Sequence, residues 1–200
     1  MTQFTLDLLN AHYQQFEVYK EDKRRTVYKD LATLARFAYN LVTVQHDQYA
    51  SGQHTLEVVQ QEAKKAFKNI RVGETGYLYA ITSKGDLTIH VAQEGENIYD
   101  AQDEKGRRFI REMCEKAVAA KPGEVLYIVY PWRNPILGET HLRNKIVAYM
   151  YFQPWDWIIA AGGYLEETYE DVVFEKKALQ ELKENILDKA VGATGYIYAM

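Results

Sequence analysis

The sequence has few of the residues that build covalent or metal-bound frameworks. Cys114 is the only cysteine among 200 residues, which excludes an internal disulfide and a zinc site made of thiolates. Helical spacing of the apolar residues around Cys114 places it on the apolar face of a helix. The chain also lacks HExxH and Walker motifs and a serine or cysteine nucleophile paired with a base. It is therefore not expected to be an enzyme, to use a cofactor or to hold a metal.

Long hydrophobic runs and an excess of positive charge are also missing. No stretch reaches the roughly 18 apolar residues of a membrane-spanning helix, and no signal peptide precedes the first helix, so these residues are expected to be soluble. The formal net charge is −4, which does not favour nucleic-acid binding.

Proline and glycine are absent from Phe4 to Ala50, where apolar residues recur at helical spacing. This pattern predicts one long helix or two nearly collinear helices. Thr55 is placed as the N-cap of a second helix, LEVVQQEAKKAFKNI, which ends before Gly73.

Five strands and one inserted helix are expected after Gly73. A hairpin turns at 83–86, a loop follows over 92–106, and a short helix is ended by Pro122–Gly123. The other three strands are EVLYIVYPW, NKIVAYMYFQ and WIIAAGGYL. These connections favour an α+β fold with an antiparallel sheet, and the long helix packs behind the sheet as a second layer.

What the sequence does contain is 16 tyrosines and a repeat. VGETGYLYAI, from Val72 to Ile81, returns as VGATGYIYAM from Val191 to Met200, with seven of ten positions identical. The copies are 119 residues apart, about the size of a domain. We interpret the chain as the first of at least two tandem modules, cut at the start of the second. The expected divisions are a long helix over 1–50, a domain over 51–167, and a connecting helix with the first strand of a second module over 168–200.

Several segments together resemble the Cache domains, the extracytoplasmic PAS-like sensor modules of bacterial chemoreceptors, histidine kinases and cyclic-dinucleotide enzymes. The resemblance runs over 31–167 and rests on the strand that opens with Lys145, on PWDWIIAAGGY, and on a D-x-x-G motif before a helix. It is strongest for the Cache type with one long N-terminal helix, here in series with a second copy. Each motif alone would be a weak signal.

The resemblance implies a PAS-like five-stranded antiparallel sheet with a long N-terminal helix and a C-terminal helix. It implies a periplasmic or extracellular domain of an inner-membrane protein, with no catalysis in this region. It also implies that a small organic anion, such as acetate, pyruvate, lactate or propionate, binds between the sheet and its covering loop and helix.

The strand NKIVAYMYFQ suggests where such an anion could bind. Period-two alternation puts Lys145, Val147, Tyr149 and Tyr151 on one face and apolar residues on the other, which should pack on the long helix. An ammonium beside two phenols suits a small anion in a mostly apolar pocket. The competing interpretation is that Lys145 pairs with a structural carboxylate or extends to the edge of the strand.

Further ligand-binding candidates surround this strand. Tyr130 would donate a hydrogen bond, as Tyr149 would, while Trp132 and Tyr79 would form apolar walls, although core packing explains such aromatic residues equally well. His90 and Arg111 could each bind a carboxylate, and both could instead be ordinary surface or core residues. The predicted site residues are Tyr79, His90, Arg111, Tyr130, Trp132, Lys145 and Tyr149.

One other function competes with ligand sensing. The domain could be a ligand-free spacer or dimerisation module of a tandem receptor. A parallel homodimer through the N-terminal helix is one hypothesis for its oligomeric state, which the sequence does not settle. A spacer would have no need of a buried ammonium among tyrosines, so the surroundings of Lys145 distinguish the two.

Overall fold

The computed structural model describes residues 3–134, 137–164, 167, 190–191 and 195–196 of the chain. Residue contacts divide the chain into two compact units, one of residues 1–26 and 168–200 and the other of Val27–Glu167. The second unit, called here the sensor unit after the family that the sequence resembles, holds the main sheet and all of the predicted site residues. The predicted connecting helix over 168–189 lies outside the described residues.

A single uninterrupted helix, α1 (Gln3–Ala50), opens the chain, so the alternative of two collinear helices is wrong. In its sensor-unit part, the buried residues Leu31, Ala35, Ala38 and Val42 follow one another at intervals of three or four. This spacing gives the helix one apolar stripe, which packs against the sheet. Thr55 caps α2 (Leu56–Lys68) as predicted, because its side chain accepts a hydrogen bond from the amide of Val58.

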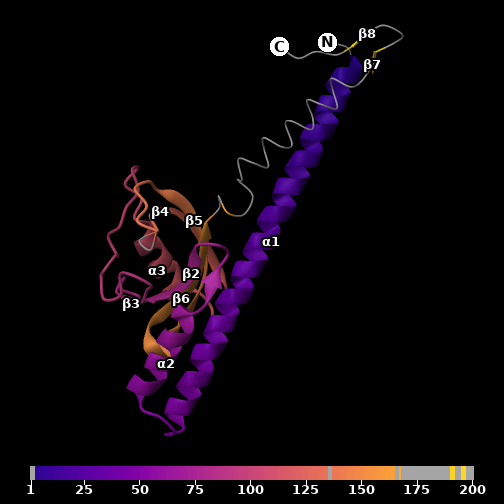
Figure 1. The fold of residues 1–200 in the computed structure, drawn as a ribbon. Coiled ribbons are helices and arrows are strands. Elements are labelled where there is room, and N and C mark those ends of the chain that lie inside the picture. The colour runs from indigo at the N-terminus through magenta and orange to yellow at the C-terminus, as the bar shows by residue number, and fades with distance from the viewer. Residues whose placement is uncertain (1–2, 135–136, 165–166, 168–189, 192–194, 197–200) are drawn as a thin grey trace. The chain divides into compact units, whose positions relative to one another are not determined.

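The main sheet has six strands in the described part of the chain, one more than predicted (Figure 1). Its order is β1-β2-β6-β5-β4, with β3 also paired to β2, and all pairings are antiparallel. The extra strand is β1, only two residues long, which turns into β2 through Gly73 at φ +60°. The strands are β1 (Arg71–Val72), β2 (Gly76–Ile81), β3 (Leu87–Ile89), β4 (Leu126–Trp132), β5 (Arg143–Phe152) and β6 (Trp157–Tyr164).

The two faces of the sheet are covered by different helices, as Figure 1 shows. On one face, Phe152 of β5 makes an edge contact with Tyr39 of α1, with ring centroids 5.5 Å apart. The other face, called here the inner face, packs on α3 (Phe109–Ala119) and on the loop before it, and its buried residues form one apolar cluster with α3. A short 3-10 helix, η1 (Gln153–Trp155), joins β5 to β6. The predicted alternation on β5 is therefore correct, since Val147 and Tyr149 belong to the inner cluster whereas Phe152 contacts α1.

The second copy of the repeat forms the same local structure as the first. In β1 and β2, Arg71 pairs with Tyr77 and Val72 with Gly76. The same pairing of positions recurs 119 residues later in β7 (Ala190–Val191) and β8 (Gly195–Tyr196). There Ala190 pairs with Tyr196 and Val191 with Gly195. The repeat thus encodes a tight antiparallel turn, while the tandem module that we expect beyond it stays a prediction.

Candidate functional site

Lys145 lies within the inner face of the sheet and is 1% exposed. Its neighbours across the sheet are Tyr130 on β4 and Tyr164 on β6. The ammonium nitrogen lies over aromatic rings, 3.7 Å from the ring centroid of Tyr77, 4.7 Å from that of Tyr79 and 5.9 Å from that of Tyr164. Among the described residues it has no ion pair and no hydrogen bond. Neither competing interpretation of Lys145, a structural ion pair or an exposed position at the edge of the strand, therefore describes its surroundings.

The side chain of Lys145 reaches these rings by crossing a glycine. The register pairs Tyr77 on β2 with Gly162 on β6 and Gly162 with Val147 on β5. A Cβ atom on Gly162 would lie 2.5 Å from Cε of Lys145, which is closer than a van der Waals contact allows. Gly162 therefore lets the aliphatic stem of Lys145 lie across the middle of the sheet.

Burial without a counter-charge dominates the electrostatics of Lys145. Burial lowers the pKa of its ammonium well below the ordinary value of 10.5. The electron-rich ring faces offset part of this cost, because a cation over a tyrosine ring is attracted by the ring quadrupole. An anion placed against the ammonium would offset far more, since a buried cation gains most from an opposite charge at short range.

His90 is committed to the protein on both ring nitrogens. Its Nε2 lies 3.1 Å from the hydroxyl of Tyr77, and its Nδ1 accepts hydrogen bonds from the amides of Ala92 and Gln93. Burial first, and then the nearby charge of Lys145, lower the pKa of His90 to about 3. The neutral imidazole therefore carries its proton on Nε2 and donates to Tyr77. We conclude that His90 orients Tyr77 rather than offering a free hydrogen bond.

Three more aromatic residues extend the site toward α3. The hydroxyls of Tyr79 and Tyr130 are hydrogen-bonded at 2.9 Å. Phe109, at the start of α3, stacks on Tyr130 with ring centroids 4.7 Å apart, and Trp132 makes an edge contact with the same ring at 6.0 Å. The indole Nε1 of Trp132 is buried close to Tyr77 but makes no hydrogen bond of full geometry in the described part of the chain. It is therefore a donor that a guest molecule could share.

Two predicted site residues lie apart from this group. Arg111 forms an ion pair with Asp100 at 2.5 Å, and its guanidinium lies 5.0 Å from the ring centroid of Tyr99. Tyr149 is buried in the inner-face cluster with α3, where burial first, and then nearby Glu112 and Cys114, raise its pKa to about 12. Between described residues, neither Arg111 nor Tyr149 has a ring contact, hydrogen bond or ion pair with Lys145.

Sequence reasoning left out two residues that the structure places beside Lys145. Tyr77 shares its face with Tyr79 at a spacing of two, and that alternation was visible in GYLYAI. Tyr164 alternates in the same way with Gly162 in AAGGY, but its pairing with Lys145 depends on the register of β5 and β6. Its hydroxyl is buried close to that of Tyr77 but makes no hydrogen bond of full geometry in the part of the chain that the structure describes.

None of the described helices is both long and apolar enough to cross a bilayer. In the same residues, no group of three or more histidine, cysteine or acidic side chains is arranged to hold a metal ion.

Solved structures with similar folds are sensor domains. A Cache chemosensory domain described for its recognition of carboxylic acids is 25% identical, with a TM-score of 0.64 over 72% of this chain and 97% of that one. A methyl-accepting chemotaxis protein from Vibrio parahaemolyticus is 24% identical, with a TM-score of 0.61 over 76% of this chain and 98% of that one. A periplasmic sensor domain of a chemotaxis protein is 22% identical, with a TM-score of 0.60 over 68% of this chain and 92% of that one.

The sequence itself matches one family model over nearly its whole length. The model of the Cache domain covers residues 6–200, and the long N-terminal helix and antiparallel sheet agree with that match. The chain belongs to the Cache domain family of sensor domains.

Proposed function

We propose that the sensor unit binds a small carboxylate, of the size of acetate, propionate, pyruvate or lactate, against the ammonium of Lys145. One observation carries this proposal: Lys145 is buried among ring faces with no anion of the described protein beside it. A buried polar group without a partner makes the folded protein less stable. Proteins keep such a destabilising feature mainly at functional sites. The similar Cache chemosensory domain described for carboxylic acid recognition supports the choice of ligand class.

Each neighbouring side chain has a role under this proposal. Lys145 supplies the positive charge, and Trp132 and Tyr164 offer buried polar atoms that lie close to Tyr77 but make no hydrogen bond of full geometry among the described residues. Tyr79 and Tyr130 form an apolar wall whose hydroxyls are already paired with each other. The site therefore has one cation and several neutral donors, which suits a monocarboxylate with a short apolar or hydroxylated tail. A six-atom acid could gain at most about 9 kcal/mol, so the affinities to search are about micromolar or weaker.

A thermal-shift and calorimetry series tests the proposal. Acetate, propionate, pyruvate and lactate are titrated into the wild type, into Lys145→Met, and into Lys105→Met as a control at an exposed lysine of the covering loop. At least one acid should raise the melting temperature of the wild type and of Lys105→Met by about 5 °C at 100-fold excess over its Kd, and should leave Lys145→Met unchanged. Equal shifts in all three proteins, or an equal shift with sodium chloride, would show that Lys145 is not the anion site.

We also propose that the sensor unit lies outside the cytoplasm in a membrane-anchored receptor, with signals passed along its helices. The similar periplasmic sensor domain of a chemotaxis protein supports this location. Alkaline phosphatase should be active when it is fused after Glu167 in the full-length receptor and expressed in a Gram-negative bacterium. An inactive fusion that is present in the cell at normal levels would place the unit in the cytoplasm.

A second function, dimerisation, has one observation in its favour. Phe37 and Val44 of α1 are 55% and 56% exposed and seven residues apart, so they lie on one side of the helix. A second copy of this chain, packed in parallel along α1, would cover both. Light scattering across a concentration series should show dimers for the wild type and monomers for a Phe37→Glu, Val44→Glu variant. If ligand binding fails and this dimer forms, the domain is better described as a spacer.

A further inference from the structure

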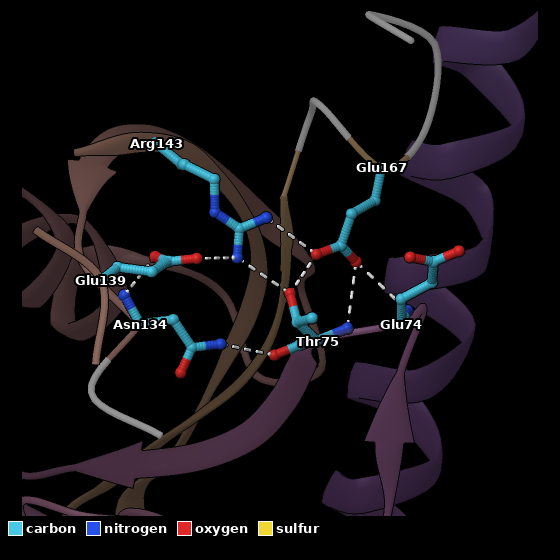
Figure 2. A network of polar contacts seen from close by, with 6 residues as sticks. All are labelled: Glu74, Thr75, Asn134, Glu139, Arg143 and Glu167. Carbon is cyan, nitrogen blue, oxygen red and sulfur yellow. Dashed lines mark hydrogen bonds and ion pairs between the residues drawn. The ribbon is translucent and has the colours of Figure 1, made fainter. Parts of the chain in front are cut away.

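A buried polar network holds the last residue of the sensor unit, as Figure 2 shows. The guanidinium of Arg143, at the start of β5, forms ion pairs with Glu139 at 2.7 Å and with Glu167 at 2.9 Å, and it donates to the hydroxyl of Thr75 at 2.9 Å. The side chains of Arg143, Glu139 and Glu167 are only 10% to 12% exposed. We call Thr75, Glu139, Arg143 and Glu167 the Arg143 junction.

The junction fixes Glu167 from several sides. The carboxylate of Glu167 accepts hydrogen bonds from the amides of Glu74 and Thr75, each at 3.1 Å, and from the hydroxyl of Thr75. Burial opposes ionisation of Glu167, but the hydrogen bonds from Thr75 and Arg143 outweigh it and hold its pKa below the ordinary value. Because Glu167 is the last residue of the sensor unit, the junction controls how firmly the chain is held where it leaves that unit.

One ring lies between the junction and the anion site. The guanidinium carbon of Arg143 is 3.7 Å from the ring centroid of Tyr164, and the ammonium of Lys145 is 5.9 Å from the same centroid. Tyr164 is also the direct cross-strand neighbour of Lys145 and lies three residues before Glu167. Its buried hydroxyl lies close to that of Tyr77 but makes no hydrogen bond of full geometry among the described residues, so it can bind a guest at Lys145 while its ring supports Arg143.

We propose that Tyr164 couples the Lys145 site to the Arg143 junction, so that an anion bound at Lys145 tightens the hold on Glu167. The identity of the guest rests on the function proposed above, whereas the coupling concerns side chains that are already in contact. A bound anion that accepts a hydrogen bond from Tyr164 fixes its ring, and a fixed ring is a firmer platform for the guanidinium. By thermodynamic reciprocity, a weaker junction must then lower the affinity for the anion.

Amide hydrogen exchange of Glu74 and Thr75 reads the junction directly, because both amides donate to Glu167. In the 200-residue chain, saturating propionate should slow their exchange at least about threefold relative to the amide of Leu78 in the middle of β2. Tyr164→Phe keeps the ring but lacks the hydroxyl, so propionate should no longer slow the two amides. Glu94→Gln, which removes an ion pair between the covering loop and α2, is the control and should respond like the wild type.

A second arm needs no ligand and separates the coupling from the proposed function. Lys145→Met removes one of the two cations at the Tyr164 ring, so the amides of Glu74 and Thr75 should exchange at least about threefold more slowly than in the wild type. In a Tyr164→Leu background the same substitution should have no such effect. If propionate binds the wild type but the two amides do not respond, the coupling is wrong and the anion site stands. If no acid binds yet Lys145→Met acts through Tyr164, the coupling stands and the proposed ligand class is wrong.

Discussion

A buried lysine without a carboxylate reduces the stability of the fold that contains it, and Lys145 is such a residue. The unfolded chain exposes the ammonium to water, whereas the folded chain surrounds it with the rings of Tyr77 and Tyr79. The folded state therefore binds this proton more weakly than the unfolded state. The penalty is absent above the unfolded pKa of 10.5, grows as the pH falls below it, and is complete below the folded pKa.

Lys145→Met should accordingly stabilise the empty domain while it removes anion binding. Methionine has a similar length and no charge to desolvate, so the free energy of unfolding at pH 7 should rise by about 1 to 3 kcal/mol. The gain should shrink as the pH approaches 10, because the wild type loses its penalty there. Urea denaturation of both proteins from pH 6 to pH 10 measures this difference, with Lys105→Met as control. A destabilised Lys145→Met variant would mean that the ammonium supports the fold.

The sequence predicted the type of candidate site, a cation among aromatic rings, but only some of the residues that surround the cation. Alternation along β5 identified Lys145 and its face, since a period of two is a local property of a strand. The contacts of Tyr164 with Lys145 and Arg143 depend on how β5 and β6 align, which no local pattern specifies. The ion pair of Arg111 could not be predicted either, because its partner, Asp100, lies eleven residues away in an irregular loop.

At the scale of elements, two adjacent glycines of β6 serve different sides of the sheet. A Cβ atom on Gly162 would meet Lys145 on the inner face at 2.5 Å, whereas one on Gly163 would meet Leu31 of α1 and Val72 of β1 at 3.8 Å, an ordinary contact. Neither glycine has a positive φ. The pair GG therefore has a steric requirement at one position and tolerance at the other.

Gly162→Ala should weaken carboxylate binding at least about tenfold, because the new methyl group displaces the stem of Lys145 and a charge-assisted hydrogen bond is lost. The variant should lose less free energy of unfolding than free energy of carboxylate binding, because the flexible end of the Lys145 side chain can move away from the new methyl group. Gly163→Ala is the matched control and should keep the affinity of the wild type. Isothermal titration with the acid that binds best measures both, and equal affinities in the two variants would show that the path of Lys145 across Gly162 does not matter.

The sequence predicted which segments form helices and strands better than it predicted which of these elements contact one another. None of the 48 residues of α1 is proline, and its apolar residues recur at helical spacing, so a helix was expected there. The strands of the sheet were found because apolar and aromatic runs are bounded by glycine and proline. The two residues of β1 were missed because Arg71 and Val72 carry no strand pattern of their own and pair only through the turn at Gly73.

At the scale of the whole molecule, acid stability should depend on the junction more than on surface ion pairs. Hydrogen bonds lower the pKa of Glu167, Glu94 and Glu112 despite their partial burial. A lowered folded pKa means that the stabilisation is complete above the ordinary value of 4.5 and is lost as the pH falls through the folded value. The side chain of Glu167 is 10% exposed, against 29% for Glu94 and 32% for Glu112, so solvent screens the interactions of Glu167 least.

Glu167→Gln should therefore flatten the fall in melting temperature between pH 5 and pH 3, because glutamine has no proton to gain in that range. At pH 7 the same variant should be less stable than the wild type, since a neutral amide leaves Arg143 with one carboxylate instead of two. Glu94→Gln is the comparison, as it removes more exposed ion pairs with Lys64 and Lys68 and should reduce the acid response less than Glu167→Gln does. Differential scanning calorimetry at half-unit pH steps measures all three proteins. An undiminished acid response in Glu167→Gln would place the acid-labile interactions elsewhere in the chain, because a buried carboxylate that loses its charge must lose its ion pair.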